Sequence, residues 1–186
     1  MLTTGRREAE AARLSNLLFL LGDAARMPFL DGSFDLVVSR FAVHHFEEPA
    51  RQIGEMARVC RPGGRVAIVD LVTADEAPAV EYNRLERMRD PSHARALAVS
   101  ELSRLMDDAG ASVEHEASHD QTLAIDRWLA QAKTPAESGR AIRGELEADL
   151  AGGAPTGMRP LRRDGELHFT QRWAIIVARK PGAVAG

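Results

Sequence analysis

The sequence predicts an α/β fold built around a parallel sheet. Three short apolar runs, at residues 16–21, 34–39 and 65–72, have the composition of strands that are buried on both faces. Helix-forming stretches at residues 6–14 and from Pro49 onward alternate with these runs. The order helix, strand, helix, strand is typical of parallel strands joined by crossover helices.

Breakers and periodicity set the elements of the first half. Pro49 suits the first turn of a helix, and two glutamates precede it at the positive end of the helix dipole. Apolar residues at i, i+3, i+4 and i+7 give this helix one buried stripe: Ile53, Met56, Ala57 and Cys60. The segment Arg61-Pro62-Gly63-Gly64 predicts a turn that ends the helix before the strand at 65–72.

The second half has a looser pattern. We predict a polar helix at 78–89, a helix capped by Ser100 and ended by Gly110, a half-exposed strand at 111–118, two helices within 123–150 split near Pro135, a flexible loop at 152–157 and a strand at 167–178. We expect Trp128 and Trp173 to be core residues or pocket wall.

Composition narrows the class of protein. The chain has 24 Lys+Arg against 27 Asp+Glu in 186 residues, a net charge of −3, which argues against nucleic acid as the main partner. No apolar run approaches the roughly 20 residues of a membrane span, and the N-terminus lacks the core of a signal peptide. Cys60 stands alone, which excludes an intrachain disulfide. We therefore expect a soluble cytoplasmic protein.

One chemical motif is better explained as structure. His115-Glu116-Ala117-Ser118-His119 fits the zinc-protease pattern H-E-x-x-H, which requires a helix so that both histidines project from one face. Here the segment alternates as a strand, on which four residues span about 13 Å, too far for both histidines to share one ion. We expect two solvated histidines.

Candidate site residues follow the predicted strands, where open α/β sheets bind ligands. Asp23 follows the first strand; its carboxylate can accept a hydrogen bond from an amine, although Gly-Asp can also be a simple turn. His44 and His45 follow the second strand and could supply a base, bind a ligand or cap the next helix. Neighbours on a strand point oppositely, so both serve one ligand only if the backbone turns there. Asp70 ends the third strand and is a weaker candidate.

The remaining polar residues have simpler structural interpretations. Asp35 begins its strand at the opposite edge and is expected to be solvated or a cap. The segment 89–93 could place His93 over a pocket, but a turn with a surface histidine is the better interpretation. Cys60 is expected to behave as a small core residue.

Four segments in this order and spacing together resemble the class I methyltransferases that use S-adenosylmethionine, in the small-molecule branch that includes the ubiquinone/menaquinone enzymes. They are Gly22-Asp23-Ala24 through Phe29, Asp31-Gly32-Ser33-Phe34-Asp35-Leu36-Val37, His44-His45-Phe46, and Arg58 through Arg65. The resemblance covers residues 1–118 well and the final strand moderately. It implies a Rossmann-like sheet with flanking helices and an antiparallel final strand, in a domain spanning 1–180, with a helical cap at 120–166 and a tail at 181–186.

The resemblance implies a role for each matching residue. Asp23 would bind the adenine amine of S-adenosylmethionine, with the Ala24 backbone on the ring nitrogen and Met27 against the ring face. Ser39, Arg40 and Phe41 would border the methionine part and the methyl group. His44 or His45 would face a small-molecule acceptor. The sulfonium carries the difficult chemistry, and the protein holds the acceptor in line with the methyl group.

The sequence departs from the family at its opening. The family begins with a strand and a glycine loop of the type G-x-G, but no two glycines here are separated by one residue, and Met1 aligns with the helix after the family's second strand. We therefore expect an incomplete sheet whose strand at 16–21 pairs with the strand at 34–39, pairs with another chain in a homodimer, or leaves an exposed edge.

Three functions remain open on this evidence. The first is a small-molecule methyltransferase, which this truncated chain represents in active or inactive form. The second is a non-catalytic homologue that acts as an interaction or dimerisation module. The third is a hydrolase or metal-dependent enzyme that uses His44 and His45 or the pair His115 and His119. The resemblance favours the first.

Overall fold

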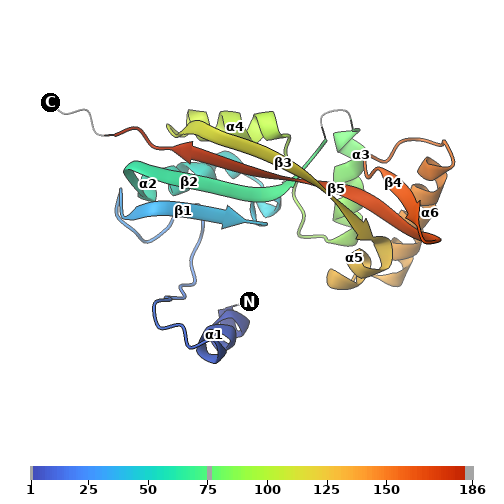
Figure 1. The fold of residues 1–186 in the computed structure, drawn as a ribbon, viewed down its shortest axis with the longest axis horizontal. Coiled ribbons are helices and arrows are strands. Elements are labelled where there is room, and N and C mark those ends of the chain that lie inside the picture. Colours follow the sequence, from blue (N-terminus) through green and yellow to red (C-terminus); the bar gives the residue numbers. More distant parts are fainter. Residues whose placement is uncertain (1, 75–76, 183–186) are drawn as a thin grey trace.

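The computed structural model of the chain describes residues 2–74 and 77–182 (Figure 1). A five-stranded open sheet has the order β1-β2-β5-β3, and β4 pairs with β5. The strands are β1 (Phe34–Arg40), β2 (Cys60–Val72), β3 (Ser112–Ala124), β4 (Pro160–Arg163) and β5 (Glu166–Arg179). β1 and β2 are parallel, whereas β5 is antiparallel to β2, β3 and β4. The α/β class and the antiparallel final strand are therefore confirmed.

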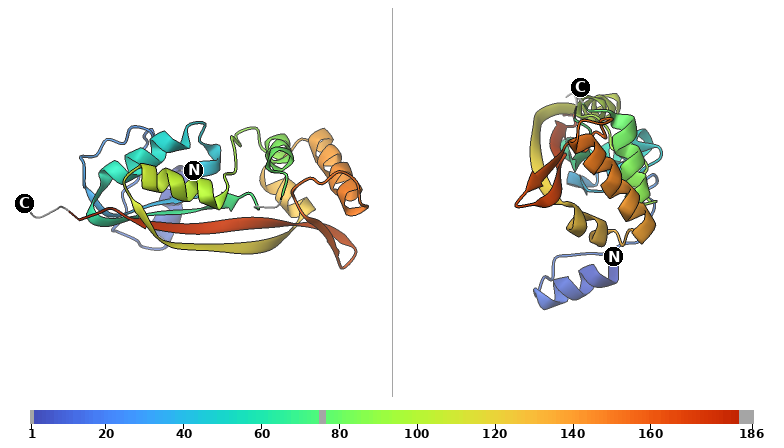
Figure 2. Two further views of the ribbon diagram at one scale, coloured as in Figure 1. Left: turned by 90° about the horizontal axis from the view of Figure 1, so that it is seen from above. Right: turned by 90° about the vertical axis from the view of Figure 1, so that its right-hand side faces the viewer.

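Helices cover one face of this sheet. They are α2 (Pro49–Val59), α3 (Ala79–Arg89), α4 (Val99–Asp108), α5 (Ile125–Gln131) and α6 (Ala136–Leu150). Figure 2 shows these five helices on the same side of the strands, whereas α1 (Leu2–Ala11) stands away from the sheet. None of the helices in the described ranges is long and apolar enough to cross a membrane.

Two apolar clusters hold the helices to the sheet. The first lies beneath α2 and α4 and includes Ile53, Leu102 and Ile176, all within 1% of full burial. The second lies beneath α3, α5 and α6 and includes Leu146 and Phe169. β5 contributes to both clusters, because it runs the full length of the sheet (Figure 1).

The prediction of a buried strand at 16–21 is wrong. The segment forms no strand, and Leu18 and Leu21 are 81% and 90% exposed. An apolar run of this kind is buried on both faces only when strands flank it. Among the described residues, β1 pairs with β2 alone, so its outer edge is free and nothing holds the segment against it.

Two local details also differ from prediction. The segment 61–64 continues β2 instead of forming a separate turn, and Gly63, at φ +76°, donates its N–H to the Lys180 carbonyl at 2.9 Å. A Cβ on Gly64 would lie 2.8 Å from the Asp35 carbonyl oxygen, so the close approach of β1 requires glycine there. Helix α4 begins at Val99 without a side-chain cap, so Ser100 is inside the helix.

The hairpin between β4 and β5 was missed. Its two-residue loop is Asp164-Gly165, with φ values of +53° and +80°. An Asp-Gly pair between strands is a recognised signal for a tight hairpin, because both positions need positive φ.

At its other end, β5 leads into Lys180, whose Nζ donates to the carbonyl oxygens of Ala57 (2.8 Å) and Cys60 (2.9 Å) at the end of α2.

Candidate active site

The candidate site begins where the parallel strands β1 and β2 end. Arg40 lies opposite Val69, so the residues that follow both strands meet at one edge of the sheet. Phe41 has a φ of +49°, and its N–H donates to the Val69 carbonyl at 2.8 Å. A bulky residue in this left-handed region is strained, and such strain gathers at functional sites. It turns the chain into the short 3-10 turn η1 (Val43–His45).

Asp70, near the end of β2, is 1% exposed and holds this turn by hydrogen bonds from its carboxylate. Its Oδ2 accepts the N–H groups of Ala42 (3.1 Å) and Val43 (2.7 Å), and its Oδ1 accepts the N–H of Leu71 (2.8 Å). The same Oδ1 lies 2.5 Å from His44 Nδ1. A carboxylate can only accept here, so we assign the proton of the buried His44 to Nδ1 and leave Nε2 as the basic nitrogen.

The turn brings the two adjacent histidines to the same place. Their ring centroids are 4.1 Å apart, and His45 Nδ1 donates to the Ser92 carbonyl at 2.9 Å. On an extended strand the two side chains would point oppositely, but the 3-10 turn changes their directions. His44 and His45 therefore both line the same cavity.

His93 is buried and is not the surface residue that its turn predicted. It is 3% exposed, its Nε2 donates to Asn83 Oδ1 at 2.8 Å, and its ring lies 5.5 Å from that of His44. The preceding turn folds back because Asp90 accepts the N–H and hydroxyl of Ser92, which directs the next side chain toward α3. Burial, reinforced by the charges of neighbouring histidines, lowers the pKa of His93 to about 3.

A cavity of about 480 Å³ opens beside η1, between the ends of β1 and β2 and the helices α3 and α5. Its wall combines aromatic, cationic and imidazole side chains, among them Phe41, His44, His45, Arg89, Arg127, Trp128 and Trp173. Trp173 packs edge-to-face on Phe41, with ring centroids 4.7 Å apart. Both tryptophans are thus pocket wall, and Trp128 is core as well.

A buried polar network lies behind this wall. Glu86 is 1% exposed, and its Oε1 accepts from the Tyr82 hydroxyl and from Gln171 Nε2, each at 3.0 Å. Gln171 Oε1 in turn accepts the indole N–H of Trp173 at 2.8 Å. Burial raises the pKa of Glu86 and raises that of Tyr82 well above its usual value. The network fixes the amide of Gln171 and, through it, the Trp173 ring.

Sequence reasoning missed Glu86, Arg89 and Gln171. The helix at 78–89 shows few apolar residues, so nothing in its pattern distinguishes a buried glutamate from a solvated one. Arg89 and Gln171 become site residues only because α3 and β5 meet at the cavity. The one local signal was Trp173, two residues after Gln171 on the same strand.

The residues predicted to bind a cofactor fall into two groups. Phe41 lines the cavity, and Ser39 and Arg40 lie just before it at the end of β1. Asp23, Ala24 and Met27 belong to the loop before β1 and do not line this cavity.

Helix α2 holds that loop in place. The Met27 N–H donates to Glu55 Oε2 at 2.9 Å, and Arg58 donates to the carbonyls of Phe29 (2.8 Å) and Met27 (3.1 Å). Hydrogen bonds from Arg58 lower the pKa of Glu55, and those to Glu55 and Asp31 raise the pKa of Arg58. The loop that carries Asp23 is thereby fixed to helix α2 through Glu55 and Arg58.

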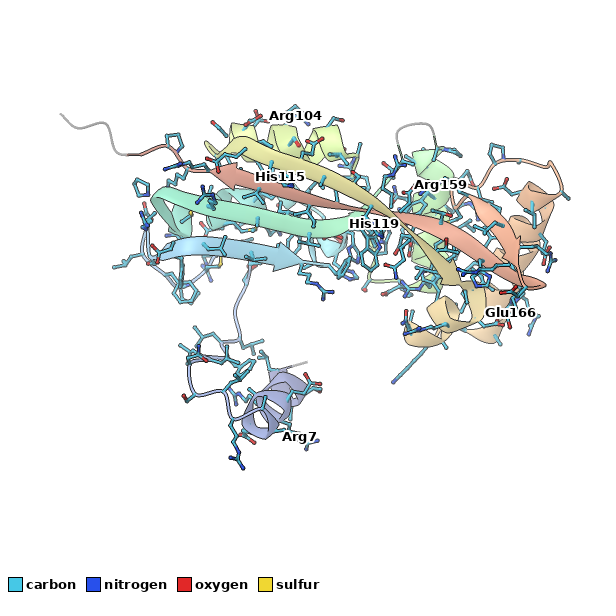
Figure 3. All side chains as sticks on the ribbon, in the orientation of Figure 1. Arg7, Arg104, His115, His119, Arg159 and Glu166 are labelled. Carbon is cyan, nitrogen blue, oxygen red and sulfur yellow. The ribbon has the colours of Figure 1, made fainter. Side chains whose placement is uncertain are left out.

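The other motifs behave as structural features. His115 and His119 lie along β3 and are exposed (Figure 3), so the strand conformation predicted for the H-E-x-x-H segment is confirmed. No group of three or more His, Cys, Asp or Glu within residues 2–74 and 77–182 is placed to hold a metal ion. Asp35 is exposed and pairs with Arg61, and Cys60 is a buried free thiol.

An open α/β sheet with a buried Asp–His pair and a cavity at the carboxyl ends of its parallel strands has its candidate site where sheets of this class bind ligands. Residues 1–68 match the family described as "Methyltransferase domain". The chain is 31% identical over 144 residues to the uncharacterized protein YafE of Escherichia coli, covering 77% of this chain and 70% of that protein. It is also 31% identical over 135 residues to the uncharacterized methyltransferase YcgJ of Bacillus subtilis, covering 72% of this chain and 53% of YcgJ.

Solved structures agree with the sequence relatives. A putative methyltransferase from Bacillus halodurans superposes with a TM-score of 0.85 at 29% identity, covering 97% of this chain and 78% of that one. A demethylmenaquinone methyltransferase from Beutenbergia cavernae is 40% identical over 76 residues, which is 32% of its length. The chain belongs to the class I S-adenosylmethionine-dependent methyltransferases.

Proposed function

We propose that the chain transfers a methyl group from S-adenosylmethionine to a small-molecule acceptor held in the cavity beside η1. The observation that carries the proposal is the buried pair of Asp70 and His44 at the edge of that cavity. The distance from Asp70 Oδ1 to His44 Nδ1 is 2.5 Å. Family membership supports catalysis over a purely structural interaction module.

The donor set of the Asp23 loop fits the adenine end of S-adenosylmethionine. Asp23 is exposed, and its Oδ1 accepts only the N–H of Ala25 at 2.8 Å, which leaves Oδ2 available for an amine. The Ala24 N–H has no hydrogen-bond partner among residues 2–74 and 77–182, so it can donate to a ring nitrogen. Met27 would pack against the ring. When bound, S-adenosylmethionine supplies an electrophilic methyl group on a sulfonium.

The chain's own residues would then orient and activate the acceptor. Asp70 fixes His44 with its proton on Nδ1, so Nε2 can receive a proton from an acceptor hydroxyl or amine as the methyl group is transferred. Phe41 and Trp173 present an apolar wall that excludes water from this corner. His45, hydrogen-bonded to Ser92, would position the acceptor beside His44.

Two measurements on the full chain test the proposal. Titration calorimetry with S-adenosylmethionine should show binding, and Asp23→Ala should weaken it by about 1–3 kcal/mol through loss of a charged acceptor. Asp35→Ala, at the start of β1, is the matched control, and this variant should bind S-adenosylmethionine with the affinity of the unmodified chain. Equal affinities in both variants would remove Asp23 from the cofactor site.

The role of His44 is tested separately. His44→Gln should lower methyl-transfer kcat by about 10²–10⁴-fold, the usual contribution of a positioned base, while leaving cofactor affinity unchanged. An acceptor with a low pKa needs no base, so the loss should shrink as acceptor acidity rises. A loss that is the same for every acceptor would assign His44 to positioning alone.

We also propose that the free edge of β1 is the contact for a second copy of the chain. Leu18 and Leu21, in the segment before β1, are among the most exposed apolar residues of the described chain. Leu36 and Val38 on β1 itself are 55% and 54% exposed. Exposed apolar side chains on an unpaired edge strand favour strand pairing between copies. Light scattering should give a dimer that Leu18→Glu disrupts; a monomer at all concentrations would refute the contact.

A further inference from the structure

We propose that the acceptor which this cavity selects carries an oxyanion, such as a carboxylate or phosphate, on a planar apolar body, and that Arg89 and Arg127 bind the charged group. This inference deepens the proposed function, because it concerns the acceptor in the same cavity. It rests on three observations: an arginine with an unused donor in a nearly dry corner, a second arginine at the wall, and aromatic rings in the same wall.

Arg89, the last residue of α3, has a fixed guanidinium group in which one nitrogen has no hydrogen-bond partner among the described residues. Its guanidinium lies 4.7 Å from the centre of the Trp128 ring, and its Nε donates to the Trp128 carbonyl at 3.2 Å. Nη1 reaches Glu86 Oε2 at 3.5 Å. Among the described residues, Nη2 has no hydrogen-bond partner, although the side chain is only 17% exposed. A guanidinium with so little water around it gains from an added acceptor.

The same corner is poor in hydrogen-bond acceptors. The indole Nε1 of Trp128 is buried and has no partner in the part of the chain that the structure describes. Glu86 Oε1 is already engaged by Tyr82 and Gln171. A carboxylate or phosphate carries acceptors alone and matches the planar fork of an arginine.

Arg127, on α5, adds a second positive charge to the wall. Its side chain lines the cavity and makes no hydrogen bond or ion pair with any residue of the ranges 2–74 and 77–182. Asp90 also lines the cavity, but its Oδ1 accepts both the N–H (2.9 Å) and the hydroxyl (2.6 Å) of Ser92, and these bonds lower its pKa. The wall therefore holds two guanidinium groups and one carboxylate, whose Oδ1 is engaged by Ser92, while Glu86 pairs with Arg89 from behind the wall.

The aromatic residues define the body of the ligand. Phe41, Trp128 and Trp173 line the cavity, whose volume of about 480 Å³ suits a two-ring molecule. Trp173 is held by Gln171 at 2.8 Å, so its face is fixed before a ligand arrives. An apolar plane with one anionic end would lie between the rings and the arginines.

The test compares three probes of one shape by titration calorimetry on the full chain, without S-adenosylmethionine. The probes are 2-naphthoate, 2-naphthyl phosphate and the neutral 2-naphthamide. We expect at least one anion to bind about tenfold more tightly than the amide, which is about 1.4 kcal/mol. The better anion identifies the oxyanion class. Equal affinity for all three, or no binding at millimolar concentration, overturns the proposal.

Variants locate the charge. Arg127→Gln should remove most of the anion preference, and Arg89→Gln should remove it if that variant folds. Arg87→Gln is the matched control, because Arg87 lies on the same helix, is exposed and donates to the Ala94 carbonyl at 3.1 Å. A preference that survives in both cavity variants overturns the assignment.

The proposed function and this inference fail in different ways. Anion preference without methyl transfer would contradict the methyltransferase proposal alone. Methyl transfer from bound S-adenosylmethionine, with equal affinity for charged and neutral probes, would contradict only the acceptor class.

Discussion

At Asp70, four donors converge on one buried carboxylate: three backbone N–H groups and the Nδ1 of His44. Asp70→Asn leaves one acceptor oxygen and places an amide N–H against these donors. We expect a loss of about 2–4 kcal/mol of unfolding free energy, since each unmet buried donor costs about 1–3 kcal/mol. Urea unfolding measures it. Asp35→Asn, whose side chain is 83% exposed, should change stability by less than about 0.5 kcal/mol; equal losses in the two variants would contradict this role.

His93 predicts how stability depends on pH. Its pKa is about 3 when folded and 6.5 when unperturbed. The unfolded chain therefore binds the proton first, and the stability from neutral His93 is complete above pH 6.5 and falls as pH drops toward 3. Urea unfolding at pH 7 and pH 5 should differ by about 1–2 kcal/mol from this group. His93→Gln should reduce this dependence of stability on pH, whereas His115→Gln, at an exposed position, should not. An unchanged dependence in His93→Gln would show that His93 does not cause it.

The local sequence identified several residues of the site correctly, but it did not predict their contacts or their burial. Asp70 and the His44-His45 pair were identified because they follow strands. Asp70 was nevertheless ranked as the weaker candidate, since three of its four partners come from a turn that the sequence does not reveal. His93 was assigned to the surface from its Asp-Pro-Ser turn, yet packing against Asn83 buries it. Burial of a turn residue depends on distant contacts.

At the scale of elements, the junction of β1 and β2 depends on one glycine. A Cβ on Gly64 would lie 2.8 Å from both the Asp35 carbonyl oxygen and Cys60 Sγ. Gly64→Ala should therefore cost about 1–3 kcal/mol through overpacking. Gly144→Ala is the control, because that glycine lies within α6 with nothing inside 4 Å of its Cβ position, and it should stabilise by about 0.5–1 kcal/mol. Thermal unfolding distinguishes the two variants. A Gly64→Ala variant of unchanged stability would show that β1 can move away from β2 to make room for the methyl group.

Elements were predictable where the signal was local. The apolar stripe from Ile53 to Cys60 predicted α2 because a helix repeats every 3.6 residues and buries that stripe. Its last member, Cys60, is buried but begins β2 instead of ending the helix. The run at 16–21 has equally clear composition, but a strand also needs a partner, and composition carries no information about the partner. The hairpin of β4 was overlooked although Asp164-Gly165 signalled it.

At the scale of the whole molecule, β5 joins the two apolar clusters into one unfolding unit. Ile176 lies in the first cluster, whereas Trp128 packs in the second and Trp173 against it. We expect Ile176→Ala to lose about 2–5 kcal/mol and to shift the tryptophan-fluorescence midpoint in urea as much as the circular-dichroism midpoint. Phe169→Ala, in the second cluster, should do the same. Midpoints that separate would show that the clusters unfold independently.

The contacts of Lys180 have a practical consequence for anyone who expresses this protein. Its ammonium closes the last carbonyls of α2, and its backbone N–H bonds the Gly64 carbonyl at 3.0 Å. A C-terminal purification tag or fluorescent fusion that retains Lys180 should leave these bonds intact. A shortened gene that stops at Arg179 would leave the Ala57 and Cys60 carbonyls without this donor and would remove the bond to Gly64, where β2 passes closest to β1.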